Sequence, residues 1–317
     1  MRPTKLLAAA AAFCLLTACN GDLFVSDPAG AACDAPPATF GAARALSDHR
    51  ESDVHFTCEG VTLAGSLYLP NGPGPHPALV WVHGSGQERR LGYGGALAST
   101  LVRAGFAVLT YDKRGVGESG GVCCPGDGDH FNLLAADVVG AVNLLRARSD
   151  IDARQIGLLG ASQAGWIVPI AAVRSGHVAF TALVDAPTVT TGEERLYSEI
   201  TGDDVGRDRA LAKPEIARRL KEAGPSGFDP VPFLRRMSGP GLWLYGAQDR
   251  SMPPDESAAV LDRLKATDGK DFTVVVFPNA GHGLLDARPS DPEALPTLVA
   301  WLQEHVHVAP AASDGQG

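Results

Sequence analysis

The distribution of hydrophobic and polar residues changes along the chain. Between residues 54 and 70, apolar and polar side chains alternate around a Glu59-Gly60 pair, which is the pattern of a half-buried antiparallel hairpin with a tight turn. From residue 77 onward the apolar runs become continuous. The runs 77–84 and 106–112 have the length of strands and flank a segment, 94–105, with helical spacing. Continuous apolar strands separated by helices predict a parallel sheet that is buried on both faces.

This rhythm continues to the end of the chain. We expect further strands at 155–161, 178–186, 241–247 and 272–278, and further helices at 131–150, 165–175, 257–266 and 292–306. Such alternation with right-handed crossovers builds an open, twisted sheet with helices on both sides. The predicted fold class is therefore α/β, with a mostly parallel sheet.

Residues 188–238 interrupt the rhythm. They form a charged stretch without regular alternation, and long insertions into compact domains are often functional lids. We expect a small helical cap here, with a solvated surface excursion as the alternative. Trp166 and Tyr197 could either line a pocket beneath such a cap or serve only as packing residues.

Composition limits the classes of function. The chain of 317 residues is 45% hydrophobic and contains 37 glycines, which suits one large globular domain with many tight turns. Its formal net charge of −9 repels phosphate backbones, and no basic run interleaved with aromatic residues opposes that repulsion. Nucleic acid is therefore not an expected partner.

The N-terminus has the pattern of an export signal. Arg2 and Lys5 precede an apolar, alanine-rich stretch that is short for a membrane span. The sequence Leu-Thr-Ala-Cys at 16–19 resembles the bacterial lipobox, in which the cysteine is lipidated before cleavage. We expect a bacterial cell-envelope lipoprotein held on the membrane by acyl chains on Cys19, with a periplasmic protein released by an ordinary secretory signal as the alternative.

The expected organisation follows from these boundaries. Residues 1–18 form the signal peptide, 19–48 a flexible tether, 49–308 the globular domain with its cap, and 309–317 a disordered tail. The oligomeric state is left open.

Export would place the remaining cysteines in an oxidising compartment, where disulfides persist. Cys33, Cys58, Cys123 and Cys124 permit three complete pairings, among which the sequence does not choose. The adjacent Cys123 and Cys124 have no companion Cys or His at a ligand spacing, so we expect a disulfide role and no metal site.

The stretch LLGASQAGW at 158–166 contains the candidate nucleophile, Ser162. It lies between a predicted strand and a predicted helix, where a strained turn can expose a serine hydroxyl at the carboxyl edge of a parallel sheet. Gly160 fits the G-x-S-x-G pattern, but Ala164 stands where the last glycine is expected, and Gly165 follows it. The alternative is a serine that only caps the following helix.

A catalytic serine needs a base and an acid that orients the base. His282 follows the last predicted strand and lies between two glycines, at the position in chain order where the base is expected. Asp249 follows the preceding strand and is the preferred acid. Asp185, which ends an earlier strand at the same sheet edge, is the alternative.

Negative charge on the substrate carbonyl oxygen requires fixed N–H donors. The backbone amide of Gln163, directly after the nucleophile, is one candidate. The sequence His-Gly-Ser-Gly at 83–86 follows a strand, and its small residues let the Ser85 amide point inward. We therefore expect the oxyanion hole at Ser85 and Gln163.

A second glycine motif, G-x-G-x-x-G at 115–120, resembles a dinucleotide fingerprint. No helix pattern opens at its third glycine, so the motif lacks the context of a dinucleotide site. We expect no cofactor.

The ordered motifs YDKRGVGES, GASQAGW, YGAQDR and AGHG together resemble the α/β-hydrolase superfamily, in particular exported esterases of the dienelactone-hydrolase and acyl-thioesterase-like branch. This resemblance implies a Ser162, Asp249 and His282 triad that hydrolyses a small-molecule ester or thioester without a metal or cofactor. The departure at Ala164 leaves the rate open, and the sequence does not define the acyl chain length. The alternatives are an aminopeptidase-like amide hydrolase and a catalytically silent binding protein of the cell envelope.

Overall fold

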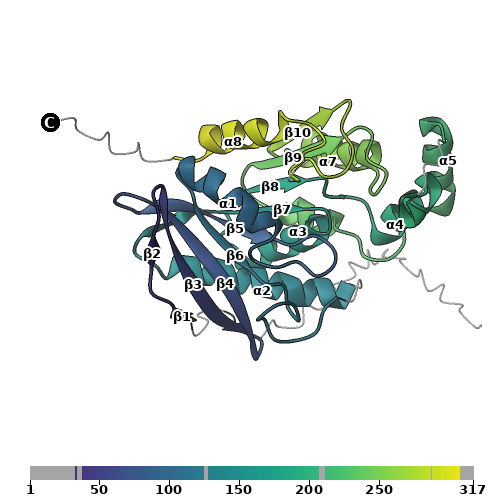
Figure 1. The fold of residues 1–317 in the computed structure, drawn as a ribbon. Coiled ribbons are helices and arrows are strands. Elements are labelled where there is room, and N and C mark those ends of the chain that lie inside the picture. Colours follow the sequence, from purple (N-terminus) through teal and green to yellow (C-terminus); the bar gives the residue numbers. More distant parts are fainter. Residues whose placement is uncertain (1–32, 34–37, 125–127, 207–210, 287, 308–317) are drawn as a thin grey trace, which may run out of the picture. The chain divides into compact units, whose positions relative to one another are not determined.

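Within residues 33, 38–124, 128–206, 211–286 and 288–307, which the computed structural model describes, ten strands form one sheet. The strand order is β1-β3-β4-β6-β5-β7-β8-β9-β10, and β2 pairs with β3. Figure 1 shows this arrangement. The strands are β1 (Ala38–Phe40), β2 (Arg44–Ala45), β3 (His49–Cys58), β4 (Val61–Pro70), β5 (His76–Val82), β6 (Ala107–Tyr111), β7 (Ile151–Ala161), β8 (Phe180–Val184), β9 (Gly241–Gly246) and β10 (Phe272–Phe277).

The sheet begins antiparallel and continues parallel. β3 and β4 form the predicted hairpin, and Glu59 and Gly60 at its turn have φ angles of 48° and 73°. Two successive positive φ angles give a turn whose twist matches that of the paired strands. β4 then pairs antiparallel with β6, whereas β6, β5, β7, β8, β9 and β10 are parallel neighbours. The carboxyl ends of the parallel strands therefore meet at one edge.

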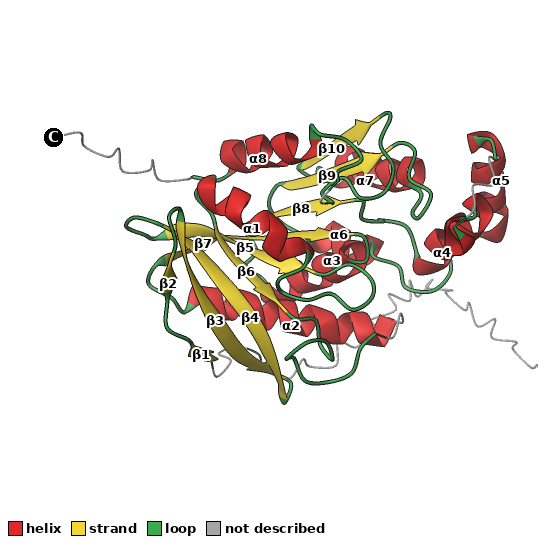
Figure 2. Cartoon of the chain, viewed as in Figure 1, coloured by secondary structure: helices red, strands yellow, loops and turns green. Residues whose placement is uncertain are grey.

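Helices cover both faces of the sheet, as Figure 2 shows. Helices α1 and α8 pack on one face, and α2, α3, α6 and α7 pack on the other. The α/β fold class predicted from the sequence is confirmed. The helices are α1 (Tyr93–Arg103), α2 (Gly128–Arg146), α3 (Ala164–Ser175), α4 (Thr191–Thr201), α5 (Lys213–Ala223), α6 (Val231–Arg236), α7 (Pro254–Asp268) and α8 (Ala294–His305), with a 3-10 helix, η1 (Asp203–Val205).

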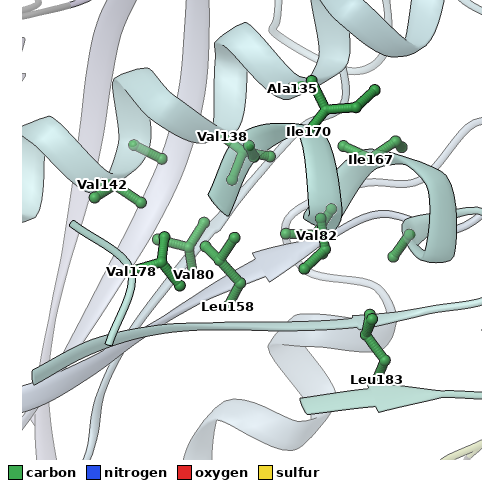
Figure 3. Packing of buried hydrophobic residues seen from close by; sticks show 14 of the residues in the cluster. Val80, Val82, Ala135, Val138, Val142, Leu158, Ile167, Ile170, Val178 and Leu183 are labelled. Atoms are coloured by element: carbon green, nitrogen blue, oxygen red, sulfur yellow. The ribbon is translucent and has the colours of Figure 1, made fainter. Parts of the chain in front are cut away.

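Burial on both faces explains why the central strands are continuously apolar. Val80 and Leu158 belong to the core beneath α2 and α3, where Figure 3 shows them near Val138. Their chain neighbours Leu79 and Leu159 belong to the core on the other face. Successive side chains point to opposite faces of a strand, so a strand covered on both sides has no solvent-facing positions for polar residues.

The prediction of a flexible tether over residues 19–48 is wrong for residues 38–45, which contain two strands. β1 and β2 both pair antiparallel with β3. Cys33 is buried, forms a disulfide with Cys58, and accepts a 3.0 Å hydrogen bond at its carbonyl oxygen from Asn143 of α2. Edge pairing joins residues 38–45 to the sheet and the disulfide fastens Cys33, and neither kind of contact leaves a periodic pattern in so short a sequence.

Several other predictions fall on residues that the structure does not describe. The signal peptide, Cys19 and the C-terminal tail lie outside the described residues. Among the residues described, none of the helices combines the length and the apolar character needed to cross a membrane. The structure pairs the other two cysteines, Cys123 and Cys124, with each other.

The segment between β8 and β9, predicted as the cap, contains α4, η1, α5 and α6. Helix α4 begins with a capping box, in which Thr190 and Glu193 each bind the other's backbone N–H. Helices α4 and α5 share a small hydrophobic cluster of their own, made by Tyr197, Ile200, Ile216 and Leu220. Helix α6 instead packs into the core against α3.

The G-x-G-x-x-G motif at 115–120 forms a loop that is tied to the sheet. The Asp112 carboxylate accepts hydrogen bonds from the backbone N–H of Arg90 at 2.8 Å and of Glu118 at 2.9 Å. A β-carbon on Gly117 would lie 2.4 Å from this carboxylate, and the residue has a φ angle of 58°. This glycine is therefore required by the close approach of the Asp112 side chain.

Strand β7 and helix α3 approach closely on either side of Ser162. A β-carbon built on Gly160 would lie 2.6 Å from the β-carbon of Ala164, and one on Gly165 would lie 2.3 Å from the Pro187 carbonyl oxygen. The methyl group of Ala164 fits because residue 160 has no side chain. The glycine that the common motif places at 164 is instead needed at 165.

We predict that Gly165→Ala lowers the free energy of unfolding by about 1–3 kcal/mol, because its methyl group forces the Pro187 backbone away. Ala164→Gly removes a buried methyl group without a clash and should lower it by about 1–2 kcal/mol, through lost burial and lower helix propensity, without displacing the Pro187 backbone. Urea unfolding of both variants measures this. Equal stability of Gly165→Ala and the parent would contradict the packing argument.

Candidate active site

Ser162 lies in the turn between β7 and α3 with a φ angle of 54°. A positive φ angle is unusual for a residue with a side chain and stores strain that the surrounding structure must hold in place. Its backbone N–H donates a 3.0 Å hydrogen bond to the Val184 carbonyl oxygen at the end of β8. The serine therefore lies on a strained, anchored turn at the carboxyl edge of the sheet, as the sequence predicted.

His282 and Asp249 come together at the same edge. His282 Nδ1 lies 2.7 Å from Asp249 Oδ2, in a hydrogen bond between the loops that follow β10 and β9. The other carboxylate oxygen of Asp249 accepts hydrogen bonds from the backbone N–H of Ser251 at 2.8 Å and of Met252 at 3.1 Å. The Asp249 side chain is fully buried, whereas that of His282 is 35% exposed. This arrangement fixes the imidazole ring and leaves it accessible from the site.

The electrostatic environment favours the protonated form of His282. Burial by itself lowers the pKa of this group, but the hydrogen bond and charge of Asp249, together with the charges of Asp185 and Asp203, raise the pKa to about 9. Since the folded-state pKa lies above the usual value near 6.5, protonation stabilises the fold. This contribution is complete below about pH 6.5 and is lost as the pH rises through about 9.

Asp185, the alternative acid, has a different role in the structure. Its Oδ2 accepts 2.9 Å hydrogen bonds from the backbone N–H groups of Gly283 and Leu284. Asp185 thus holds the backbone of the histidine loop, while Asp249 bonds to the ring. Burial raises the pKa of Asp185 to about 6; the His282 charge opposes this shift and the Asp249 charge adds to it.

Asp185, Asp249 and His282 are also the group in the described part of the chain whose spacing could suit a metal ion. One ligand atom from each lies within 4.8 Å of the others. In this structure Asp249 Oδ2 and His282 Nδ1 bind each other, and Asp185 Oδ2 holds two amides. These hydrogen bonds fit an orienting network for the imidazole.

Ser162 and His282 line one cavity of about 320 Å³. Its wall includes the aromatic pair Trp81 and Tyr93, whose stacked rings have centroids 5.3 Å apart. Three carboxyl groups also line it, those of Glu88, Asp185 and Asp286. Within the described residues the Ser162 hydroxyl has no hydrogen-bond partner, and catalytic hydrogen bonds often tighten only when substrate binds.

The candidate oxyanion donors lie beside the nucleophile. A β-carbon on Gly84 would lie 3.5 Å from the Ser162 β-carbon, so the loop after β5 lies against the turn of the nucleophile. Ser85 lines the cavity that contains Ser162, and Gln163 follows the serine in the chain. In the part of the chain that the structure describes, the amides of Ser85 and Gln163 donate to no other group of the protein.

A second cavity of about 320 Å³ lies on the side of the cap. Gln163, Trp166 and Phe131 line it, together with Glu194 of α4, and Ser85 belongs to both cavities. Burial raises the pKa of Glu194 to about 7, against the opposing charge of His282. Trp166 is therefore a wall residue as well as a core residue.

Tyr197, the other aromatic residue considered for a pocket wall, fastens the cap. Its hydroxyl donates a 2.6 Å hydrogen bond to the Asp249 carbonyl oxygen. Thr201 of the same helix donates a 2.6 Å hydrogen bond to the Arg250 carbonyl oxygen. Helix α4 is therefore tied to the loop that holds Asp249.

Two residues that contact the candidate oxyanion loop, residues 83–86 after β5, are not among those predicted from the sequence. Lys113 donates hydrogen bonds to the Gly84 carbonyl oxygen and to the Gln163 side chain, and Glu88 accepts one from the Gly84 N–H. Lys113 follows β6 at the same sheet edge as Ser162. The sequence could have pointed to Lys113, because it comes directly after a predicted strand and the ends of parallel strands converge at this edge.

Comparisons with known proteins identify the family and the fold of the chain. Residues 95–309, more than half of the chain, match the prolyl oligopeptidase family. An uncharacterized 31.7 kDa protein of Escherichia coli is 31% identical over 259 residues, which cover 68% of this chain and 85% of that protein. The esterase EstD of Thermotoga maritima is 26% identical over 250 residues, which cover 71% of this chain and 59% of that protein.

Solved structures show the same fold. Acetyl xylan esterase 1 from Thermoanaerobacterium has a TM-score of 0.60 at 21% identity, with 84% of this chain and 88% of that chain covered. A Pyrococcus furiosus esterase has a TM-score of 0.62 at 18% identity, with 86% and 100% covered. The family match and this fold show that the chain belongs to the prolyl oligopeptidase family and is a serine hydrolase of the α/β-hydrolase superfamily.

Proposed function

We propose that this protein hydrolyses small carboxylic esters through an acyl-enzyme formed on Ser162. One observation carries the proposal. Ser162, on a strained turn with a φ angle of 54°, shares a cavity with His282, whose Nδ1 lies 2.7 Å from the buried carboxylate of Asp249. A serine, an imidazole and an orienting carboxylate at one cavity support this proposal, because these three groups together can activate a serine hydroxyl.

In the first half-reaction, the Ser162 oxygen attacks the ester carbonyl carbon while His282 Nε2 accepts the hydroxyl proton. The carbonyl oxygen becomes an anion, which the amides of Ser85 and Gln163 stabilise. Collapse of this intermediate breaks the bond to the alcohol oxygen, which takes the proton from His282. In the second half-reaction, water attacks the acyl-enzyme with the same proton transfers, releasing the carboxylic acid and restoring Ser162.

The choice of an ester rests on the named relatives. The esterase EstD and acetyl xylan esterase 1 are named for ester hydrolysis. Thioesters are part of the proposal because a thiohydrolase of Aspergillus aculeatus is 28% identical over 193 residues. That match covers 57% of this chain and 59% of the thiohydrolase.

Amide hydrolysis is the second candidate. An acylamino-acid-releasing enzyme of rice is 25% identical over 244 residues, although the match covers only 30% of that enzyme. The same triad chemistry can cleave amides, in which case His282 protonates a leaving amine.

Charge around the site favours particular leaving groups. The leaving oxygen must reach His282, so the alcohol part occupies the cavity that His282 lines. The carboxyl groups of Glu88, Asp185 and Asp286 line that cavity, and negative charge repels an anionic ligand. We therefore propose neutral or cationic alcohols rather than acidic ones as leaving groups.

We also propose that the chain is exported and carries lipid on Cys19. The support is the sequence pattern of residues 1–19. Acyl chains buried at about 0.8 kcal/mol per methylene group would hold the protein on the cell envelope. Small-molecule esters at that surface would then be its substrates.

Ser162→Ala should abolish labelling by a fluorophosphonate probe and lower kcat for a nitrophenyl acetate ester by about 10⁴- to 10⁶-fold. Ser52→Ala, on β3, is the control and should label as the parent does. If neither the parent nor the control is labelled, the protein is a silent hydrolase scaffold and the esterase proposal is wrong.

The pH profile should follow His282, because only its neutral form can accept the Ser162 proton. We expect kcat/KM to rise with pH to an inflection near the pKa of about 9. Asp249→Asn removes the charge that raises this pKa, so the inflection should move to lower pH while kcat falls by about 10⁴-fold. An inflection unchanged by this substitution would assign the titration to another group.

Metabolic labelling with a tagged fatty acid tests the lipid proposal. The parent and a Cys14→Ala control should incorporate the tag, because only the cysteine after the cleavage site is lipidated. Cys19→Ala should incorporate none. Equal incorporation by Cys19→Ala and the parent would show that the proposed site is wrong.

A further inference from the structure

We propose that Lys113 is a positioning residue for the reaction proposed above: its ammonium group holds the two residues whose backbone amides bind the oxyanion. Lys113 itself lies behind these donors and need not touch the substrate. The inference rests on the proposed function.

Lys113 reaches the site from the loop after β6. The residue is 1% exposed. Its Nζ donates a 2.7 Å hydrogen bond to the Gly84 carbonyl oxygen and a 2.8 Å hydrogen bond to Gln163 Oε1. Gly84 follows β5, Gln163 follows β7, and β5 lies between β6 and β7 in the sheet. One side chain therefore links three separate segments at the carboxyl edge.

The bond to Gly84 sets the direction of the Ser85 amide. The Gly84 carbonyl and the Ser85 N–H are the two ends of one planar peptide group, and in a trans peptide they point in opposite directions. Drawing the carbonyl oxygen toward Lys113 turns the N–H away from it. Ser85 lines both cavities on the substrate side, which is the side where an oxyanion donor is needed.

The preceding peptide group is fixed as well. The Gly84 N–H donates a 2.8 Å hydrogen bond to Glu88 Oε1. The Glu88 backbone carbonyl in turn accepts a 3.1 Å hydrogen bond from the Lys113 N–H. Glu88 thus holds the peptide group before Gly84, and Lys113 holds the peptide group after it. Rotation of the Gly84–Ser85 peptide group is therefore opposed by hydrogen bonds on both sides of Gly84.

The bond to Gln163 fixes the second donor. Gln163 is buried at 8% exposure and directly precedes α3, with φ and ψ of −49° and −23°. Its backbone N–H is the donor, while its side-chain oxygen is held by Lys113. A side chain held in this way restricts movement of the first turn after the nucleophile, so both donors keep their geometry as charge develops.

The position of a cation here needs an explanation. Burial lowers the pKa of Lys113 to about 8, against the opposing charge of Glu88. A buried ammonium group carries a desolvation penalty that a well-packed apolar side chain avoids. Holding two oxyanion donors, with a positive charge close behind them, is a function that an apolar residue cannot supply.

The test compares Lys113→Met with Arg114→Lys. Methionine keeps an unbranched chain of similar length but removes the charge and both hydrogen bonds. Arg114 is the neighbouring buried cation and binds Asp137 rather than the oxyanion loop, so its variant controls for lost stability. For Lys113→Met we expect kcat to fall on the order of 10- to 100-fold with KM changed by less than about threefold.

A second readout separates positioning from general destabilisation. A phenylboronic acid adds to the serine oxygen and places a boron-bound oxygen in the oxyanion hole, so its affinity should fall by a factor similar to that of kcat in Lys113→Met. In Arg114→Lys both values should stay close to those of the parent. Lys113→Arg, which keeps donors and charge, should restore part of the affinity.

Gln163→Leu keeps the inference testable if Lys113→Met does not fold. It removes one acceptor of Lys113 and retains the Gln163 backbone amide, so we expect a smaller loss of kcat and of boronate affinity. Parental kcat and boronate affinity in the folded Lys113 and Gln163 variants would overturn the inference. That result is distinct from failure of the proposed function, which would appear as a parent that the fluorophosphonate probe does not label, or as Ser162→Ala retaining parental activity.

Discussion

The left-handed backbone of Ser162 is the constraint on which the rest of the site depends. A residue with a side chain held at a φ angle of 54° stores about 1–3 kcal/mol of strain. That strain persists because the Ser162 N–H is bonded to β8 and because Gly160 and Gly165 let α3 approach the backbone around it. The buried contacts between β7, α2 and α3 (Figure 3) offset the strain. Core packing therefore stabilises the strained turn that presents the Ser162 hydroxyl group at the edge of the sheet.

The charges at the carboxyl edge of the sheet have opposite signs in the two halves of the site, negative around His282 and positive around residues 83–86 and Gln163. Around His282, the charges of Asp249 and Asp185 favour the imidazolium and make the ring a strong base. Around the oxyanion loop, Lys113 supplies positive charge behind the two amides. In the proposed mechanism, the proton moves toward the negatively charged half of the site and the oxyanion forms beside the positively charged half. The same charges make protonated His282 stabilise the fold at low pH, where it cannot accept a proton.

The candidate site was largely accessible from the sequence for a geometric reason. Ser162, Asp249 and His282 each follow a predicted strand of a parallel sheet, and the ends of such strands meet at one edge. Both Asp249 and Asp185 end or follow strands at this edge; the chain order favoured Asp249 as the orienting acid, but no separate role followed from the sequence for Asp185. Their separation depends on loop conformation, since one carboxylate reaches the ring and the other reaches two loop amides.

By itself the sequence determined the fold class, the alternation of strands and helices from residue 54 onward, and the segments that meet at one sheet edge. Burial on two faces makes the strands continuously apolar, and the intervening helices keep a helical spacing of apolar residues, so both are visible along the chain. Only the tertiary structure decided which glycine admits α3, why Ala164 is tolerated, how residues 38–48 join the sheet, and where Lys113 places its charge. These features depend on contacts between residues far apart in the chain. Distances of a few ångströms between such residues leave no periodic signal along it.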